Sequence, residues 1–202
     1  MTVIEDAHSG DAPLGRAERT RALIVAATRQ LFLERGYAGT TVNAITEACG
    51  ISRAGFYTYF KDKREVFGYL GDSAYRDLRV VLALWDTYPE PRRRSDVRDF
   101  VRAYFDYMDR HGAFALAASF SAPDTEDFRR GNTRMQTRVA WILGQAISAG
   151  SEHSPEVVGI AALGLLDRAW HTVQTQTIAV DKDEMIAFLA ETLFGMGTHP
   201  AH

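Results

Sequence analysis

Apolar residues recur along most of the chain at helical spacing, with polar positions between them. Spacings of three or four residues place apolar side chains on one face of a helix. No segment shows the sustained period-2 alternation that is typical of a half-buried strand. The pattern therefore predicts an all-α fold. Its clearest series are Ile24, Ala27 and Leu31, then Phe100, Tyr104 and Met108, and then Met185, Leu189, Leu193 and Met196.

Six prolines divide the chain into long proline-free segments. Because proline cannot continue a helix interior, these positions mark helix boundaries. Gly36 is expected as a left-handed cap that ends the first helix, and His111-Gly112 as the stop of another. Together these signals predict about nine helices, at 16–36, 41–48, 52–59, 62–86, 94–111, 113–120, 124–149, 155–178 and 182–196.

The composition is ordinary for a globular protein, with 46% hydrophobic and 24% charged residues. It argues against a disordered, collagen-like or coiled-coil chain. No apolar run reaches the roughly 18 residues of a membrane-spanning helix, and residues 1–15 lack the features of a signal peptide. One cysteine, Cys49, excludes an intramolecular disulfide and a multi-cysteine metal site. We therefore expect a cytoplasmic protein without a membrane partner.

The net charge of −3 conceals an uneven distribution. Residues 1–11 carry three acids and no Lys or Arg, residues 12–65 carry nine Lys and Arg against five acids, and residues 66–202 carry fourteen against eighteen. A basic block before a larger acidic one favours two parts with different partners, with nucleic acid as a candidate for the first. A difference in net charge of this size between two segments also arises by chance.

The basic block contains the spacing of a helix-turn-helix in Thr40–Phe60. Thr41 is a good N-cap for a short helix, Gly50 ends that helix, and Ser52 caps a second one. The apolar stripe of the first short helix consists of Val42, Ile45 and Ala48. This is the layout of a DNA reader whose second helix enters the major groove.

The second short helix has two different faces. Phe56 and Phe60 fall on one side and are expected in the core, whereas Arg53 on another side can pair with a guanine edge. Tyrosines and lysines nearby suit phosphates, which fix register and do not read sequence. Each of these could instead be a solvated surface residue, and Tyr59 a packing residue. The expected DNA-binding set is Thr40, Thr41, Asn43, Ser52, Arg53, Ala54, Gly55, Tyr57, Thr58, Tyr59, Lys61 and Lys63.

The stretch from about Ile24 to Phe67 resembles the TetR family of bacterial transcriptional regulators. The resemblance rests on AATRQLFLERGY and on TTVNAITEACGISRAGFYTYFKDKREVF, about one fifth of the chain. Three positions depart from the family: Thr46 and Cys49, where alanine is more common, and Tyr59, where histidine is commonest. The segment GISRAGFYTYF is similar to the EthR-like branch of this family.

The resemblance implies a dimeric, ligand-responsive repressor of a palindromic DNA operator, released by a small apolar or aromatic effector. It implies an N-terminal tail at 1–15, a helix-turn-helix domain at 16–62, and a ligand-binding and dimerisation domain at 63–198. The helix at 62–86 would join the two domains. No cofactor or metal is expected. The chain lacks the P-loop, G-x-G-x-x-G, H-E-x-x-H and G-x-S-x-G motifs, so no enzyme is expected.

The second part of the chain is rich in aromatic residues, which favours a pocket for an apolar or aromatic molecule. Most of these side chains could equally be ordinary core. A few polar residues are candidates for directional contacts with the ligand. The expected pocket residues are Trp85, Tyr104, Tyr107, Met108, Phe114, Phe120, Phe128, Trp141, Gln145, Trp170, His171 and Gln174.

Small residues in the segment 155–178 allow another helix to approach closely. With the last helix, this segment suggests a four-helix dimer interface, although an internal core helix has the same pattern. Asp167 and Arg168 sit mid-helix, where they can pair across the interface, line the pocket or face solvent. The expected interface residues are Val158, Ala162, Leu165, Leu166, Leu189 and Leu193.

Two other function classes stay open from the residues alone. One is an architectural DNA-binding protein without an effector, which would have a filled core in its larger domain. The other is an enzyme or carrier whose first part only mimics the motif. Sequence-preferring DNA binding would separate the enzyme or carrier from the repressor and the architectural protein. A response of DNA binding to a small molecule would then separate the repressor from the architectural protein.

Overall fold

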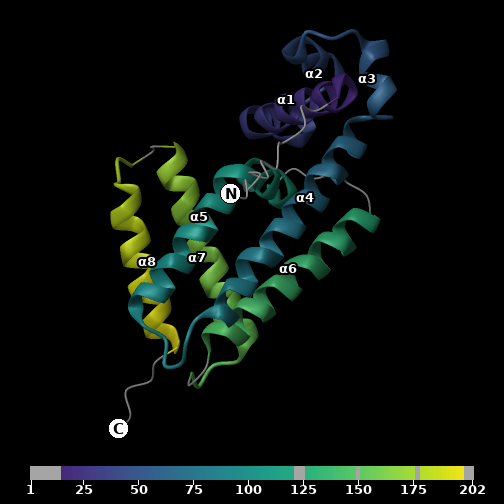
Figure 1. The fold of residues 1–202 in the computed structure, drawn as a ribbon. Helices are drawn as coiled ribbons and strands as arrows, with labels where there is room; N and C mark the ends of the chain where they lie inside the picture. The colour runs from purple at the N-terminus through teal and green to yellow at the C-terminus, as the bar shows by residue number, and fades with distance from the viewer. Residues whose placement is uncertain (1–14, 121–125, 149–150, 176–177, 198–202) are drawn as a thin grey trace, which may run out of the picture.

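The computed structural model describes residues 15–120, 126–148, 151–175 and 178–197, and within these ranges every regular element is a helix (Figure 1). The elements are α1 (Arg16–Gly39), α2 (Val42–Cys49), α3 (Arg53–Tyr59), α4 (Lys63–Ala83), the 3-10 turn η1 (Leu84–Thr87), α5 (Arg94–Phe120), α6 (Glu126–Ile147), α7 (Pro155–Thr175) and α8 (Lys182–Gly197). In the same ranges, no helix combines the length and apolar character needed to cross a membrane. The predicted all-α fold is confirmed.

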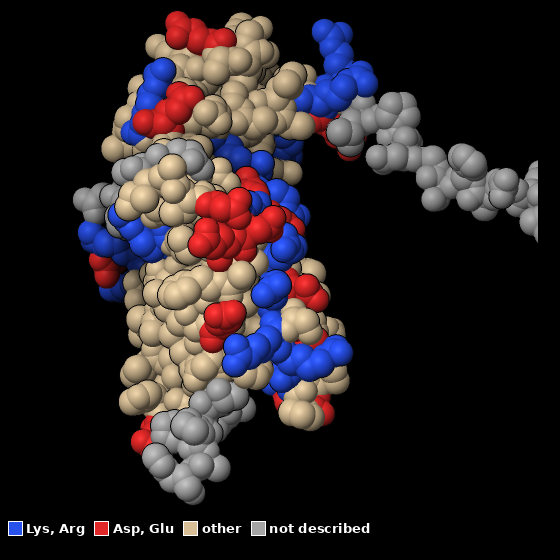
Figure 2. Space-filling model, turned by 90° about the vertical axis from the view of Figure 1, so that its left-hand side faces the viewer, with Lys and Arg blue, Asp and Glu red and all other residues tan. Residues whose placement is uncertain are grey.

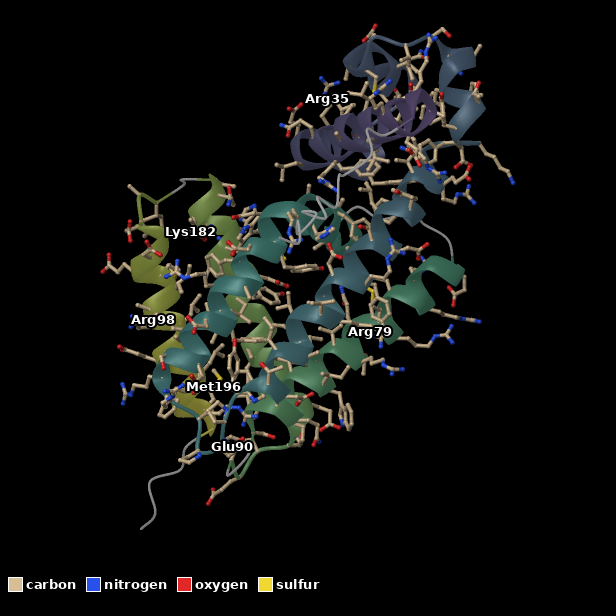
Figure 3. The ribbon with its side chains drawn as sticks, viewed as in Figure 1. Arg35, Arg79, Glu90, Arg98, Lys182 and Met196 are labelled. Carbon is tan, nitrogen blue, oxygen red and sulfur yellow. The ribbon has the colours of Figure 1, made fainter. Side chains whose placement is uncertain are left out.

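The molecule consists of a small N-terminal unit on a longer helical body (Figure 1). Helices α1, α2 and α3 form the small unit, and α4 runs from it into the body of α5 to α8. In Figure 3, Arg35 lies in the small unit, whereas Glu90 and Met196 lie at the opposite end of the body. Helix α4 therefore contributes to both parts.

Local signals define the short helices of the small unit. Gly50 ends α2 with the left-handed backbone of a cap, at φ 66° and ψ 32°. Gly36 was expected to end the first helix, but it instead kinks α1, which continues to Gly39, with a non-helical backbone at φ 67° and ψ 176°. The Thr41 hydroxyl accepts a hydrogen bond from the Ala44 amide, and Ser52 caps α3 in the same way at 3.0 Å. These caps define where α2 and α3 begin.

One predicted helix boundary is wrong. The segments 94–111 and 113–120 form one continuous helix, α5, so that the described ranges hold eight α-helices where about nine were expected. Gly112 does not end this helix, because it lies where the Trp170 ring of α7 packs against α5. A Cβ at Gly112 would overlap that ring. The glycine is required by a contact between helices.

Two apolar cores hold the fold together. The body core gathers buried side chains of α4 to α8, including Phe100, Phe105 and Leu143. The N-terminal core is built around Ile45 and Phe56, but it also takes buried side chains from α4 and α5. These further members are Val66, Phe67, Leu70, Ala74, Phe114, Ala117 and Ala118. The two units are thus joined by shared packing and not only by the chain.

The small residues of α7 serve contacts within the chain. A Cβ at Gly159 would overlap the carbonyl oxygen of Ala140 on α6, and a Cβ at Gly144 would overlap that of Pro155. Five of the six residues expected at a dimer interface are only 0–6% exposed in the single chain, because they lie in the body core. The expectation is therefore wrong for Val158, Ala162, Leu166, Leu189 and Leu193, and only Leu165, at 39%, is exposed.

Candidate nucleic-acid interface and internal cavity

Helix α3 is anchored on one side and exposed on the other. Phe56 and Phe60 are almost completely buried, as predicted, and their rings lie 6.1 Å apart. The guanidinium of Arg21 on α1 lies 5.0 Å from the centre of the Phe60 ring and 4.8 Å from that of Tyr69 on α4. This packing fixes the direction in which the exposed face of α3 points.

Three predicted DNA-binding residues meet on that exposed face. Arg53 donates one hydrogen bond to the side-chain oxygen of Asn43 at 2.6 Å and another to the Tyr57 hydroxyl at 3.0 Å. All three residues are exposed. The contacts hold the guanidinium in place on the surface while leaving further N–H donors available, since arginine has five. Such a group suits the paired acceptors of a guanine edge.

The other predicted DNA-binding residues divide by burial. Exposed side chains on α2, α3 and the following turn are those of Thr41, Ser52, Ala54, Thr58 and Lys61, while Gly55 and Tyr59 are half-buried. Thr40 is completely buried, and its hydroxyl donates to the Gly36 carbonyl at 2.8 Å. The Thr40 side chain is therefore removed from the candidate interface, because it faces the interior.

Lys63 has contacts that the sequence did not suggest. Its ammonium donates to the carbonyl oxygens of Tyr37 at 2.7 Å and Thr40 at 2.8 Å, and lies 4.2 Å from the centre of the Tyr37 ring. Burial lowers the pKa of Lys63 from its ordinary value. The side chain joins the start of α4 to the end of α1, so its role is structural in the free protein.

A partly open cavity of about 90 Å³ lies between α4, α5, α6 and α7 of the body. Of the expected pocket residues, Tyr104, Tyr107, Met108 and Phe114 line it. A larger groove of about 480 Å³ between α4 and α6 shares four lining residues with the cavity. These four are Tyr75, Phe114, Asn132 and Met135. The shared residues make the groove the natural route into the cavity.

The remaining expected pocket residues lie elsewhere. Trp85 packs in the body core with its ring 5.0 Å from that of Phe100, and Trp141 and Gln145 are exposed on α6. Their expected place in the pocket is wrong. Three others line a separate pocket of about 360 Å³ between α1, α5 and α7: Trp170, His171 and Gln174. The side chains of Phe120 and Phe128 lie outside the described residues.

Eleven of the fifteen residues that line the cavity were not among the expected pocket residues. Tyr75 and Leu78 of α4 line the cavity, as does Asp167 of α7. A signal was present in α6, where the lining residues follow the i, i+3, i+4, i+7 spacing of one helix face. They are Asn132, Met135, Gln136 and Val139. That face carries two amides, so a search for aromatic residues passed over it.

Asp167 is the acidic group of the cavity wall. Its carboxylate accepts a hydrogen bond from the Tyr104 hydroxyl at 2.6 Å. Burial raises the pKa of Asp167, and the hydrogen bond from Tyr104 acts in the opposite direction. Burial, and next the Asp167 charge, raise the pKa of Tyr107. The carboxylate is therefore close to two tyrosines in a site with little water.

Phe114 connects the cavity to the N-terminal unit. It lines the cavity and is also a buried member of the N-terminal core. Its ring centre lies 4.7 Å from that of Phe67, near the start of α4. A Cβ at Gly71 would lie 3.0 Å from the Phe114 ring, so α4 and α5 approach closely here. Displacing Phe114 from the cavity side would press on the core that supports α3.

Another junction contact lies beside it. The Nε2 atom of His111 on α5 lies 2.7 Å from a carboxylate oxygen of Asp77 on α4, and the imidazole is buried. Burial lowers the pKa of His111, although Asp77 opposes the shift and Arg29 of α1 adds to it. Within the described parts of the chain, no cluster of three or more His, Cys, Asp or Glu suited to a metal ion occurs.

Comparisons with known proteins agree with the helix-turn-helix geometry. Residues 24–70 match the family model described as bacterial regulatory proteins, tetR family. The HTH-type transcriptional repressor DhaR of a Mycobacterium species is 32% identical over 94 residues, which cover 46% of each chain. The HTH-type transcriptional regulator TtgR of Pseudomonas putida is 39% identical over 85 residues, 42% of this chain and 36% of that one. The chain thus matches less than half the length of these relatives.

Solved structures extend the likeness in fold to almost the whole chain. A TetR-like transcriptional regulator from Rhodococcus sp. RHA1 superposes with a TM-score of 0.70 at 20% identity, covering 91% of this chain and 97% of that one. The fatty acid degradation regulator FadR from Bacillus halodurans gives 0.68 at 16% identity, covering 93% and 99%. The finer resemblance to the EthR-like branch stays a prediction. Residues 24–70 of the chain thus match the tetR family of bacterial regulatory proteins, and the fold of the described residues is similar to that of solved TetR-like regulators.

Proposed function

We propose that the chain is a ligand-responsive transcriptional repressor. It binds a palindromic DNA operator as a homodimer and is released by a small apolar or aromatic effector. The Mycobacterium relative DhaR is named a transcriptional repressor, which supports repression over activation for this chain. The exposed group of Arg53, Asn43 and Tyr57 supports DNA reading by α3.

The observation that carries the proposal is the position of Phe114. One side chain lines the cavity and packs in the core on which α3 rests. A ligand acts on DNA binding only if it prefers one of two arrangements of the protein, and the effect is reciprocal. A hundredfold change in operator affinity requires about 2.7 kcal/mol of such coupling. That is within the range of repacking one phenylalanine between two cores.

The size of the cavity bears on which of the two arrangements of the protein would bind the operator. At about 90 Å³ it is far smaller than the roughly 300–1,000 Å³ of pockets that bury a drug-sized ligand. An effector that enters from the groove must therefore move α6 away from α4 or push Tyr75 and Phe114 aside. The narrow form is the one proposed to bind the operator, and the widened form the one proposed to release it.

A revised dimer face follows from the exposed apolar residues. The view from the α7 and α8 side shows a broad uncharged surface on the body, with charged side chains gathered beside it (Figure 2). Exposed apolar side chains on these helices include Val157, Ile160 and Leu165 on α7 and Phe188 on α8, the last 63% exposed. Contiguous exposed apolar surface marks interaction sites. Two half-sites one helical turn apart on DNA require two α3 helices separated by roughly 34–36 Å, and a two-fold axis through this face is the arrangement proposed to meet that requirement.

Two measurements test the proposal. Selection of bound fragments from sheared genomic DNA, followed by footprinting, should give a palindromic site that Arg53→Ala no longer discriminates. Sedimentation should give a dimer for the wild-type protein and a monomer for Phe188→Glu. Val80→Glu, a change at an equally exposed apolar residue on α4, should remain dimeric. Absence of any sequence-preferring binding at moderate salt would contradict the repressor proposal.

A further inference from the structure

The cavity contains a carboxylate without a cationic partner. Asp167 accepts one hydrogen bond, from Tyr104, and is only partly exposed. Among the residues that the structure describes, no Lys, Arg or His forms an ion pair with it. A buried carboxylate is normally paired, because removing its hydration is costly. The hydroxyl of one tyrosine replaces only part of that hydration.

The surroundings of Asp167 suit a cation with apolar substituents. Aromatic rings from α4 and α5 line the same cavity, and the electron-rich face of a tyrosine or phenylalanine attracts a cation. Two polarisable thioethers, Met108 and Met135, complete the apolar wall. The rings belong to Tyr75, Tyr104, Tyr107 and Phe114.

We propose that the cavity receives the ammonium group of a small apolar amine, with Asp167 as its counter-ion and the tyrosine rings around it. The proposal rests on the proposed function, since it names the chemical class of the effector for the same cavity. The ammonium lies at the inner end beside α7. The apolar part of the amine extends past Phe114 toward the groove, where it holds α6 away from α4.

The charged residues of the groove do not satisfy Asp167. Arg134 and Arg138 line the groove, but both are exposed, so water screens their charges. Asp72 lies on the same groove from the α4 side and is also exposed. The two arginines define the opposite possibility, an apolar anion bound at the groove, which the test below includes.

The experiment compares three probes of similar shape on the full chain by calorimetry and thermal shift, without DNA. They are 2-phenylethylamine as the cation, 2-phenylethanol as the neutral analogue and 3-phenylpropionate as the anion. The amine should bind more tightly than both others. Asp167→Asn should weaken amine binding roughly tenfold to hundredfold, the worth of a hydrogen bond to a charged group, and leave 2-phenylethanol within about twofold. Asparagine keeps an oxygen acceptor for Tyr104.

Asp99→Asn is the matched control, because it removes the same charge from an exposed position on α5 that lines neither the cavity nor the groove. It should leave amine affinity within about twofold, since exposed charges contribute little. Equal affinity for amine and alcohol, tighter binding of the acid, no amine binding at millimolar concentration, or equal losses in both variants would each overturn the proposal. If Asp167→Asn fails to fold, the affinities of the wild-type protein for the amine, the alcohol and the acid still test the proposal. Amine binding that depends on Asp167 but leaves DNA binding unchanged would uphold it and contradict the repressor mechanism.

Discussion

Replacing Lys63 by alanine should destabilise the N-terminal unit and leave the salt dependence of DNA binding unchanged. The ammonium of this residue is held by the Tyr37 and Thr40 carbonyl oxygens and by the Tyr37 ring, on the inner side of the unit. A lysine that contacts a phosphate would show the reverse: a weaker salt dependence with little loss of stability.

The expected size follows from the contacts. A hydrogen bond to a charged group contributes about 1.5–3 kcal/mol when it is fully protected from water. Lys63 makes two, at 2.7 and 2.8 Å, but it is only half-buried, and water can replace part of both in the variant. The loss in free energy of unfolding should therefore be about 2 kcal/mol, a large fraction of the stability of a small domain.

The assay combines urea unfolding with binding to a non-specific DNA duplex over a range of salt concentrations. Lys61→Ala is the matched control, because the Lys61 side chain is exposed. It should lower the slope of log affinity against log salt by about 0.9 per monomer and change stability by less than about 0.5 kcal/mol. A reduced slope in Lys63→Ala with unchanged stability would refute the structural role.

Three further predictions concern helix packing, recognition of the DNA sequence and the pH dependence of stability. Gly159→Ala should cost about 3 kcal/mol of unfolding free energy in urea, because its Cβ would overlap the Ala140 carbonyl oxygen, whereas Gly131→Ala, with open space around it, should be neutral or stabilising. Arg53→Ala should lose about 1–3 kcal/mol of discrimination at one base pair per half-site, measured by competition with single-base operator variants, without loss of stability. Because burial lowers the pKa of His111 in the folded protein, the His111 imidazole takes up a proton more readily in the unfolded chain. Stability should then fall as the pH drops below about 6.5, and His111→Gln should flatten this dependence in thermal unfolding.

The helix-turn-helix could be predicted from the sequence because its signals are local. Thr41 and Ser52 cap helices through amides three residues away, and Gly50 ends a helix through its own backbone angles. Phe56 and Phe60 are buried because they share one face of a helix. None of these inferences needs knowledge of which helices meet.

Features that depend on contacts between distant helices could not be predicted in the same way. Gly112 has the sequence signature of a helix stop, but Trp170, far along the chain, gives it a packing role inside α5. The small residues of α7 fit a dimer interface and a close intramolecular helix pair equally well, and Gly159 serves the second. Thr40 and Lys63 carry polar groups typical of a DNA contact, yet both are occupied within the chain.

Most of the cavity wall was missed for a related reason. Aromatic content alone does not distinguish a cavity lining from a filled core. From the sequence, Trp85 and Tyr104 were therefore equally good candidates for the pocket. What separates them is which helix faces converge, and α6 contributes amides and a methionine where aromatic residues were expected. The acidic group at the inner end, Asp167, becomes informative only when its neighbours are known.

The connection between the cavity and α3 through Phe114 is tested most directly by one measurement of operator affinity with and without saturating 2-phenylethylamine. The wild-type protein should bind its selected operator about a hundredfold more weakly with the amine present. Phe114→Leu should bind operator and amine separately within a few-fold of wild type and lose most of that hundredfold effect. A full effect in Phe114→Leu, or bound amine with unchanged operator affinity in the wild type, would contradict the connection.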